Sequence, residues 1–93
     1  MSGDPKHIEE LIQILAEASD PQALRAFLED LCTAKELENM AERCYAAKLL
    51  LEGKTYSQVM EQVEISSATL SRVSRCVQYG SGYKTILSTN PEN

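Results

Sequence analysis

Hydrophobic side chains recur along this chain at the spacing of helices that are apolar on one side. The first stripe follows Asp4 and Pro5, a pair that suits a helix start with Asp as the N-cap and Pro in the first turn. The second follows Asp20 and Pro21, where either Asp20 or a Ser19–Gln22 capping box can begin the helix. The two stripes consist of Ile8, Leu11, Ile12 and Leu15, and of Leu24, Phe27, Leu28 and Leu31.

A longer third helix is expected from a Thr33–Glu36 capping box to about Glu52, with Gly53 as a left-handed C-terminal cap. Its second half is apolar on nearly every side, whereas a helix with one face exposed to solvent carries polar residues on that face. A chain of 93 residues has little interior of its own. We therefore expect this central helix to be covered partly by its own chain and partly by a second copy. Its apolar residues are Leu37, Met40, Ala41, Cys44, Tyr45, Ala46, Ala47, Leu49, Leu50 and Leu51.

Residues 55–78 predict two shorter helices joined by a tight corner, the arrangement of a helix-turn-helix. A Thr55–Gln58 capping box begins the first helix, and Ser66 or Ser67 can cap the second. The apolar stripes are Val59, Met60 and Val63 on the first helix and Leu70, Val73 and Val77 on the second, with Ile65 at the joint.

Two residues depart from the usual helix-turn-helix pattern. Met60 stands where a small residue often lets the two helices approach, so we expect a wider crossing. Glu64 stands where glycine often relaxes a left-handed corner, so it either bears strain or adopts another turn.

The second helix of this pair presents a small, hydroxyl-bearing and basic outer face without a carboxylate. Such a face can enter a DNA major groove without steric or charge penalty. Its residues are expected to be Ala68, Thr69, Ser71, Arg72, Ser74 and Arg75.

A turn at Gly80-Ser81-Gly82, whose glycines permit backbone conformations that other residues resist, precedes a short closing helix with Tyr83, Ile86 and Leu87. Residues 88–93 are expected to form a loose tail. No strand pattern or internal repeat occurs. The sequence therefore predicts an all-α fold of about six helices in a single domain over residues 1–93.

The net charge of −5 argues against DNA binding, but its distribution argues for it. Residues 1–42 hold ten acidic and three basic residues, a net charge of −7, whereas residues 43–93 carry +2. Between Ser66 and Leu87 there are three basic residues, Arg72, Arg75 and Lys84, and no acidic one. The acidic half would repel a duplex, while the other half can face it.

Other functions find little support in the residues. There is no run of 18 apolar residues and no signal peptide, so we expect a cytoplasmic protein without a membrane span. Three cysteines without metal-ligand spacing are expected to be reduced small hydrophobes. The single histidine, His7, has no catalytic partner, and no phosphate-cradling lysine follows Gly82. We expect no enzyme, metal or bound cofactor.

The stretch GKTYSQV, then SSATLSRVSRCVQYGSGY, resembles the Trp-repressor superfamily, and most closely its YerC/YecD-type Trp-repressor-like proteins. The similarity covers roughly Ile8 to Leu87, and its most specific pieces are Ala68–Cys76 and Tyr79–Tyr83. The resemblance implies an all-α, intertwined homodimer that acts as a bacterial transcriptional regulator with one reading helix per subunit.

The resemblance also locates a corepressor site, which in the Trp repressor holds an indole ring between two arginines. Arg43 and Arg72 stand at the arginine positions and Thr33 at that of a nearby threonine of the partner chain. Val73 replaces the glycine that follows the second arginine, which puts room for the ring in doubt. We expect that tryptophan does not bind, and a different small-molecule corepressor remains open.

The first hypothesis is therefore a homodimeric repressor that reads a palindromic operator in double-stranded DNA. Ser67, Ala68, Thr69 and Arg72 would face base edges. Phosphates would be contacted by Ser71 or Thr55 and by Arg75, Lys54 and Lys84. The alternative is a helical protein-interaction module without DNA binding, in which the acidic first helices dock a basic partner.

Overall fold

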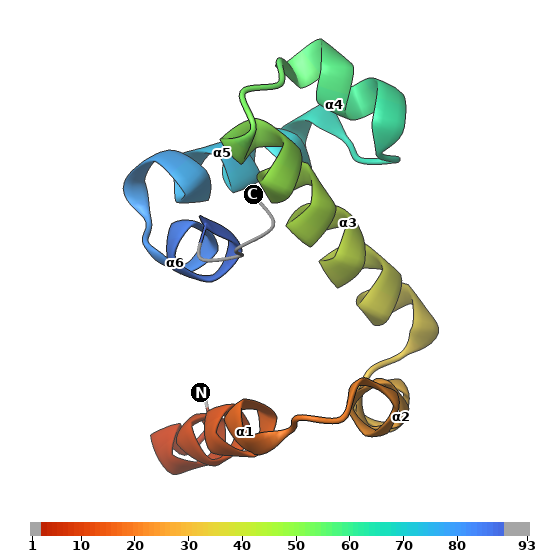
Figure 1. Cartoon of the computed structure of the whole chain (residues 1–93), viewed down its shortest axis with the longest axis vertical. Coiled ribbons are helices and arrows are strands. Elements are labelled where there is room, and N and C mark those ends of the chain that lie inside the picture. Colours follow the sequence, from red (N-terminus) through yellow and green to blue (C-terminus); the bar gives the residue numbers. More distant parts are fainter. Residues whose placement is uncertain (1–2, 89–93) are drawn as a thin grey trace. The chain divides into compact units, whose positions relative to one another are not determined.

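The computed structural model describes residues 3–88, which form six α-helices and no strand (Figure 1). The all-α class and the six helices expected from the sequence are confirmed. The helices are α1 (Pro5–Glu17), α2 (Pro21–Leu31), α3 (Ala34–Leu51), α4 (Tyr56–Gln62), α5 (Ser67–Tyr79) and α6 (Gly82–Ser88).

The chain divides into two compact units, one up to Leu37 and one from Glu38 onward, so the division falls in the first turns of α3. The single domain over residues 1–93 stays a prediction. Of the expected tail, Ser88 ends α6, and the remainder lies outside the described residues.

Side chains at the helix starts bind the N–H groups that the first turn leaves free. Asp20 accepts a hydrogen bond from the Gln22 N–H at 3.2 Å, so Asp20 rather than Ser19 caps α2. Both capping boxes form as expected. The hydroxyl oxygens of Thr33 and Thr55 accept hydrogen bonds from the backbone N–H groups of Glu36 and Gln58. The side-chain oxygens of Glu36 and Gln58 in turn accept from the backbone N–H groups of the two threonines. Local sequence signals therefore fix where these helices begin.

Glycine is needed at the ends of α3 and α5 for different reasons. Gly53 has a φ of 94°, and its N–H donates to the carbonyl of Leu50 while that of Lys54 donates to Leu49. This is a left-handed cap of the Schellman type, as expected. Gly80 instead has a φ of −89°, but a Cβ there would lie 2.7 Å from the carbonyl oxygen of Cys76. Close approach, rather than an unusual φ, therefore requires glycine at position 80.

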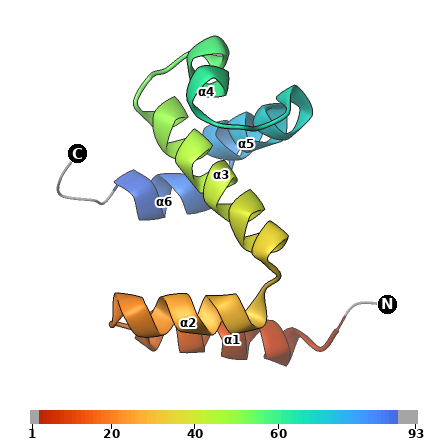
Figure 2. The same cartoon turned by 90° about the vertical axis from the view of Figure 1, so that its right-hand side faces the viewer.

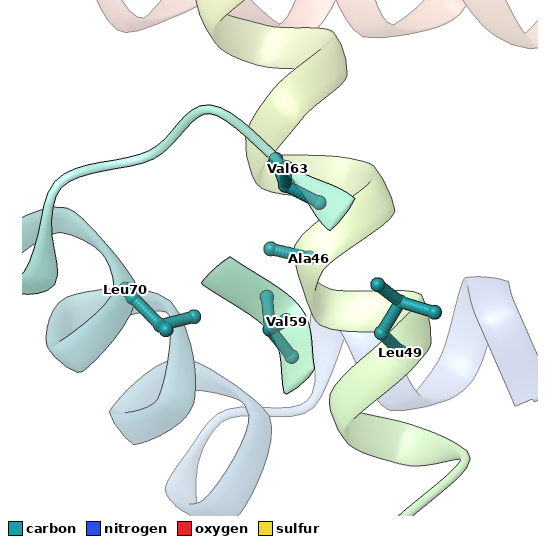
Figure 3. Packing of buried hydrophobic residues seen from close by; sticks show 5 residues of the cluster. All are labelled: Ala46, Leu49, Val59, Val63 and Leu70. Atoms are coloured by element: carbon teal, nitrogen blue, oxygen red, sulfur yellow. The ribbon is translucent and has the colours of Figure 1, made fainter. Parts of the chain in front are cut away.

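The buried core lies in the second unit, where α4 and α5 pack against the C-terminal half of α3 (Figure 2). One cluster joins α3 to the helix-turn-helix and consists of Ala46, Leu49, Val59, Val63 and Leu70 (Figure 3). A second cluster consists of Ala47, Val73 and Val77, with Tyr83 and Leu87 of α6 packed against it. Because Ala46 and Ala47 are both fully buried, α3 carries both clusters on consecutive residues.

Of three expectations for the helix-turn-helix, only the one for Ser74 needs correction. Met60 is 44 % exposed, so much of its side chain lies at the surface, and a wider crossing of α4 and α5 stays a prediction. Glu64 adopts the other turn, since no non-glycine residue in the described chain has a positive φ. Ser74 is buried rather than on the outer face, because it lies four residues after Leu70 and therefore on the same side of α5.

The apolar stripes of the first unit are present but only partly covered, since Ile8, Ile12 and Leu31 are exposed and the other five residues are half-buried. No side chain of α1 or α2 is buried within the described chain, and Ile8 and Ile12 are 65 % and 61 % exposed. On α3, Cys44 and Tyr45 are also exposed. Surfaces of this kind need a partner in water, so coverage by a second copy stays a prediction. No described helix is long and apolar enough to cross a membrane.

We predict that Gly53→Ala destabilises the fold by about 1 kcal/mol, because an L-residue is strained in the left-handed region. Space is not the cause, since a Cβ at Gly53 would meet nothing within 4 Å. The measurement is the free energy of unfolding in urea at fixed chain concentration. Gly82→Ala is the matched control, because Gly82 also has open space but no positive φ. Equal effects of the two substitutions would contradict the prediction.

Candidate nucleic-acid interface

Helix α5 has two chemically distinct sides that follow from its sequence. Its inner side is buried and consists of Leu70, Val73, Ser74 and Val77, which recur at helical spacing. Its outer side consists of Ser67, Ala68, Ser71, Arg72 and Arg75, all exposed. The core contacts of the inner side therefore hold the outer side toward solvent.

The arginines of the outer side have no competing partner. Within residues 3–88 the only ion pair joins Arg25 and Glu29 on α2, at 3.0 Å, so neither Arg72 nor Arg75 forms one. The segment from Ser66 to Leu87 contains no carboxylate. Both guanidinium groups are thus available to an anionic ligand, although the chain as a whole carries a net charge of −5.

Hydroxyl groups order the first turn of α5. The Ser66 hydroxyl accepts a hydrogen bond from the Thr69 N–H at 3.1 Å and donates to the Thr69 hydroxyl oxygen at 3.0 Å. Thr69 is half-buried, and its own hydroxyl hydrogen remains to donate. The sequence allowed either Ser66 or Ser67 as the cap. Because Ser66 takes this role, Ser67 is left free on the outer side.

The predicted phosphate contacts lie at different places around α5. Lys54 and Thr55 are exposed just before α4, although the Thr55 hydroxyl also caps that helix. Lys84 lies beyond the other end of α5, and its Nζ donates to the carbonyl oxygen of Gln78 at 3.1 Å. Sequence reasoning missed this contact, which places a positive charge at the negative end of the α5 dipole. A lysine just past a helix that ends at glycine is the sequence signal that could have predicted this contact.

The residues aligned with the corepressor site are divided between the two units. Thr33 caps α3 and belongs to the first unit, whereas Arg43 and Arg72 belong to the second. Arg43 is half-buried on α3, and no hydrogen bond joins it to Arg72. Val73 is 1 % exposed and packs with Ala47 and Val77, so its side chain fills the core beside Arg72. The part of the chain described here also holds no group of three or more His, Cys, Asp or Glu side chains that suits a metal ion.

Comparison with known proteins points to one family. The family model described as Trp repressor protein matches residues 6–90. The uncharacterized protein YerC of Bacillus subtilis (strain 168) is 36 % identical over 75 residues, which cover 81 % of this chain and 72 % of YerC.

Two crystal structures have the same fold. One, of a candidate Trp repressor from Staphylococcus aureus, has a TM-score of 0.85 and 30 % identity, covering 90 % of this chain and 85 % of that one. The other, of a TrpR-like protein from Eubacterium eligens ATCC 27750, has a TM-score of 0.84 and 34 % identity, covering 90 % and 88 %. Such a family is regulatory rather than enzymatic, which agrees with the expectation that the chain is not an enzyme. The chain therefore belongs to the Trp repressor family of DNA-binding regulators.

Proposed function

We propose that this protein is a homodimeric transcriptional repressor that reads a palindromic operator with the outer side of α5. The observation that carries the proposal is the exposed, carboxylate-free face of α5, on which Arg72 and Arg75 have no ionic partner. An α-helix of this chemistry fits the major groove, where arginine pairs with the acceptor edge of guanine. The core clusters behind α5 provide a rigid support for such contacts.

The side chains proposed to contact DNA divide by reach and chemistry. In this proposal Ser67, Ala68, Thr69 and Arg72 face base edges, since they lie in the first turns of α5, the part that enters the groove in helix-turn-helix proteins. Phosphates are met by Ser71 or Thr55, by Arg75 and by Lys54. Lys84 binds the carbonyl of Gln78. Gln78 lies roughly 17 Å along α5 from Ser67, at 1.5 Å per residue, so Lys84 meets only a distant phosphate.

A second copy supplies what one chain lacks. The partly exposed stripes of α1 and α2 and the exposed Tyr45 of α3 offer an apolar surface for dimerisation. The dimer then presents two α5 helices, which should lie about 34 Å apart to enter successive major grooves. Two equivalent reading helices account for a palindromic operator.

A corepressor of the tryptophan type does not fit this proposal. The place that glycine keeps open beside the second arginine holds the Val73 side chain, which is buried against Ala47. The dimer is therefore proposed to bind DNA without tryptophan, and any effector it answers to has a different chemistry.

We predict that Arg72→Ala and Arg75→Ala together lower operator affinity at least about a hundredfold, since a lost base contact costs about 1–3 kcal/mol. For the unchanged dimer, about six neutralised phosphates give a slope of log affinity against log salt of roughly −5. Loss of Arg75 removes one phosphate contact per subunit, so the slope of the variant should be about −3. Both quantities come from fluorescence anisotropy on an operator selected from random DNA. Arg25→Ala is the control, because it removes one exposed positive charge on α2.

An affinity unchanged by the double substitution would exclude α5 as the reading helix. A dimer that retains no DNA at micromolar concentration and low salt would favour the protein-interaction module instead.

We predict that Ile12→Glu converts the dimer to a monomer, because it places a charge in an apolar stripe that is 61 % exposed in the single chain. Gln13→Glu adds the same charge at the next position of α1, on an exposed polar residue, and should leave the dimer intact. Sedimentation equilibrium distinguishes the two states. A fully dimeric Ile12→Glu protein would rule out this face of α1 as the interface.

We predict that 1 mM L-tryptophan leaves the thermal midpoint of unfolding unchanged, because Val73 occupies the space for the ring. A ligand present at about 100 times its Kd would stabilise the folded state by roughly 2.7 kcal/mol, a shift of several degrees. The measurement is a calorimetric scan at fixed chain concentration. A shift of that size would show that Val73 moves aside.

A further inference from the structure

Two side-chain hydroxyls in the first turn of α5 are joined in a chain of hydrogen bonds that runs in one direction. The Thr69 backbone N–H donates to the Ser66 hydroxyl oxygen at 3.1 Å, and the Ser66 hydroxyl donates to Thr69 Oγ1 at 3.0 Å. A hydroxyl that accepts a hydrogen bond becomes a better donor, because the bonds of a chain polarise one another. Each bond therefore favours the direction of the other.

This direction decides what the Thr69 hydroxyl can still do. A hydroxyl has one hydrogen to donate and two lone pairs that accept. One lone pair of Thr69 Oγ1 accepts from Ser66, whereas its hydrogen has no acceptor within residues 3–88. Threonines in helices often donate to a carbonyl three or four residues back, but Thr69 forms no such bond. Its hydrogen therefore remains for a ligand.

The neighbouring serines of α5 are not constrained in this way. Ser67 and Ser71 are exposed, and their hydroxyls bind no group in the described part of the chain. Each of them can rotate to donate or to accept. Thr69 is half-buried and branched at Cβ, which restricts the rotation of its side chain. Of these three hydroxyls, Thr69 is thus the one whose polarity is fixed before a ligand arrives.

We propose that Thr69 reads a hydrogen-bond acceptor in the DNA major groove and that Ser66 is the positioning residue that fixes this polarity. The inference rests on the proposed function and narrows the bases that one reading position accepts. Acceptors in the major groove are N7 and O6 of guanine, N7 of adenine and O4 of thymine. Cytosine instead offers the amino group at N4, which donates.

Cytosine is therefore the base that Thr69 excludes. Its amino group would oppose the Thr69 hydroxyl with a second donor, so the hydrogen of Thr69 would lose its partner inside a closed interface. A palindromic operator carries this position twice, once in each half-site. Cytosine placed there in both half-sites should lower the affinity of the dimer at least about tenfold, since the costs of separate mismatches add.

The polarity of the hydroxyl pair can be tested in the free protein. Neutron diffraction from deuterium-exchanged crystals of the full chain locates the hydroxyl deuterons. The Ser66 deuteron should lie between the two oxygens, and the Thr69 deuteron should point away from Ser66. A Thr69 deuteron directed at the Ser66 oxygen would overturn the inference, whether or not the protein binds DNA.

The base preference is tested with Thr69→Val, which keeps the branched shape and removes the hydroxyl. An operator selected from random DNA is varied symmetrically to all four bases at each half-site position, and fluorescence anisotropy gives the affinities. At one position the unchanged dimer should reject cytosine at least about tenfold, and Thr69→Val should retain less than about twofold discrimination. Thr85→Val is the matched control, because Thr85 is an exposed threonine of α6. Identical base preferences of Thr69→Val and the unchanged dimer would overturn the inference.

Base analogues identify the atom that Thr69 reads. A 7-deazapurine lacks N7, 2-aminopurine lacks the O6 of guanine, and 5-methyl-2-pyrimidinone lacks the O4 of thymine. The analogue that removes the correct acceptor should weaken the unchanged dimer about threefold per half-site and leave Thr69→Val unaffected. Equal losses for the two proteins with every analogue would show that Thr69 makes no such contact.

The positioning role of Ser66 is tested by reversing the polarity. Ser66→Asp still caps α5, but a carboxylate only accepts. The Thr69 hydroxyl must then donate to it and offer lone pairs to the DNA, so the preference should move toward the amino groups of cytosine and adenine. The added charge weakens binding to every base alike, and the ratio of affinities between two bases is therefore the readout.

Ser66→Thr retains a hydroxyl and should preserve the original preference. Circular dichroism verifies that each variant is folded. An unchanged ratio in Ser66→Asp would mean that Ser66 only caps the helix, and the positioning role would be refuted.

The outcomes separate this inference from the proposed function. A dimer that selects an operator but shows no dependence on the Thr69 hydroxyl would overturn the inference alone. A protein for which no operator can be selected would refute the proposed function and the reading role of Thr69 together.

Discussion

The fold depends on two neighbouring alanines in the middle of the chain. Ala46 and Ala47 are fully buried, and each belongs to a different hydrophobic cluster. Figure 3 shows the cluster of Ala46. Because a methyl group occupies little space, α3 can approach the helix-turn-helix on one side and both α5 and α6 on the other. These contacts turn the apolar side of α5 inward. The basic, hydroxyl-bearing side of α5 faces solvent as a result, and the candidate nucleic-acid interface follows from packing behind it.

Features that depend on nearby residues could be predicted from the sequence, and features that depend on distant contacts could not. Capping pairs lie within three residues of each other, so Thr33–Glu36 and Thr55–Gln58 indicated the helix starts. The burial of Ser74 could have been read from its spacing to Leu70, but its polarity suggested an exposed residue. The exposure of Met60 and the bond from Lys84 to Gln78 depend on how helices meet in space.

For the candidate sites too, features within one helix could be predicted from the sequence, and features that combine several helices could not. The carboxylate-free face of α5 is encoded in one continuous helix, so the sequence alone indicated a surface suited to DNA. The three cysteines lie on different helices, so which of them share a surface depends on how α3, α5 and α6 meet. The resemblance placed Val73 where the Trp repressor has glycine, but its burial against Ala47 became visible only in the fold.

The connection between α3 and α4 has a mechanical consequence. The backbone N–H groups of residues 52–55 are all bonded, to carbonyls of the last turn of α3 for the first three and to the Gln58 side chain for Thr55. A segment bonded at every N–H has no slack, so it acts as a stiff coupling rather than a flexible tether. The orientation of α4 is therefore tied to the C-terminal end of α3, and α5 shares a hydrophobic cluster with both helices. A change that shortens or lengthens this connection would turn the whole helix-turn-helix relative to α3 rather than be absorbed by a flexible loop.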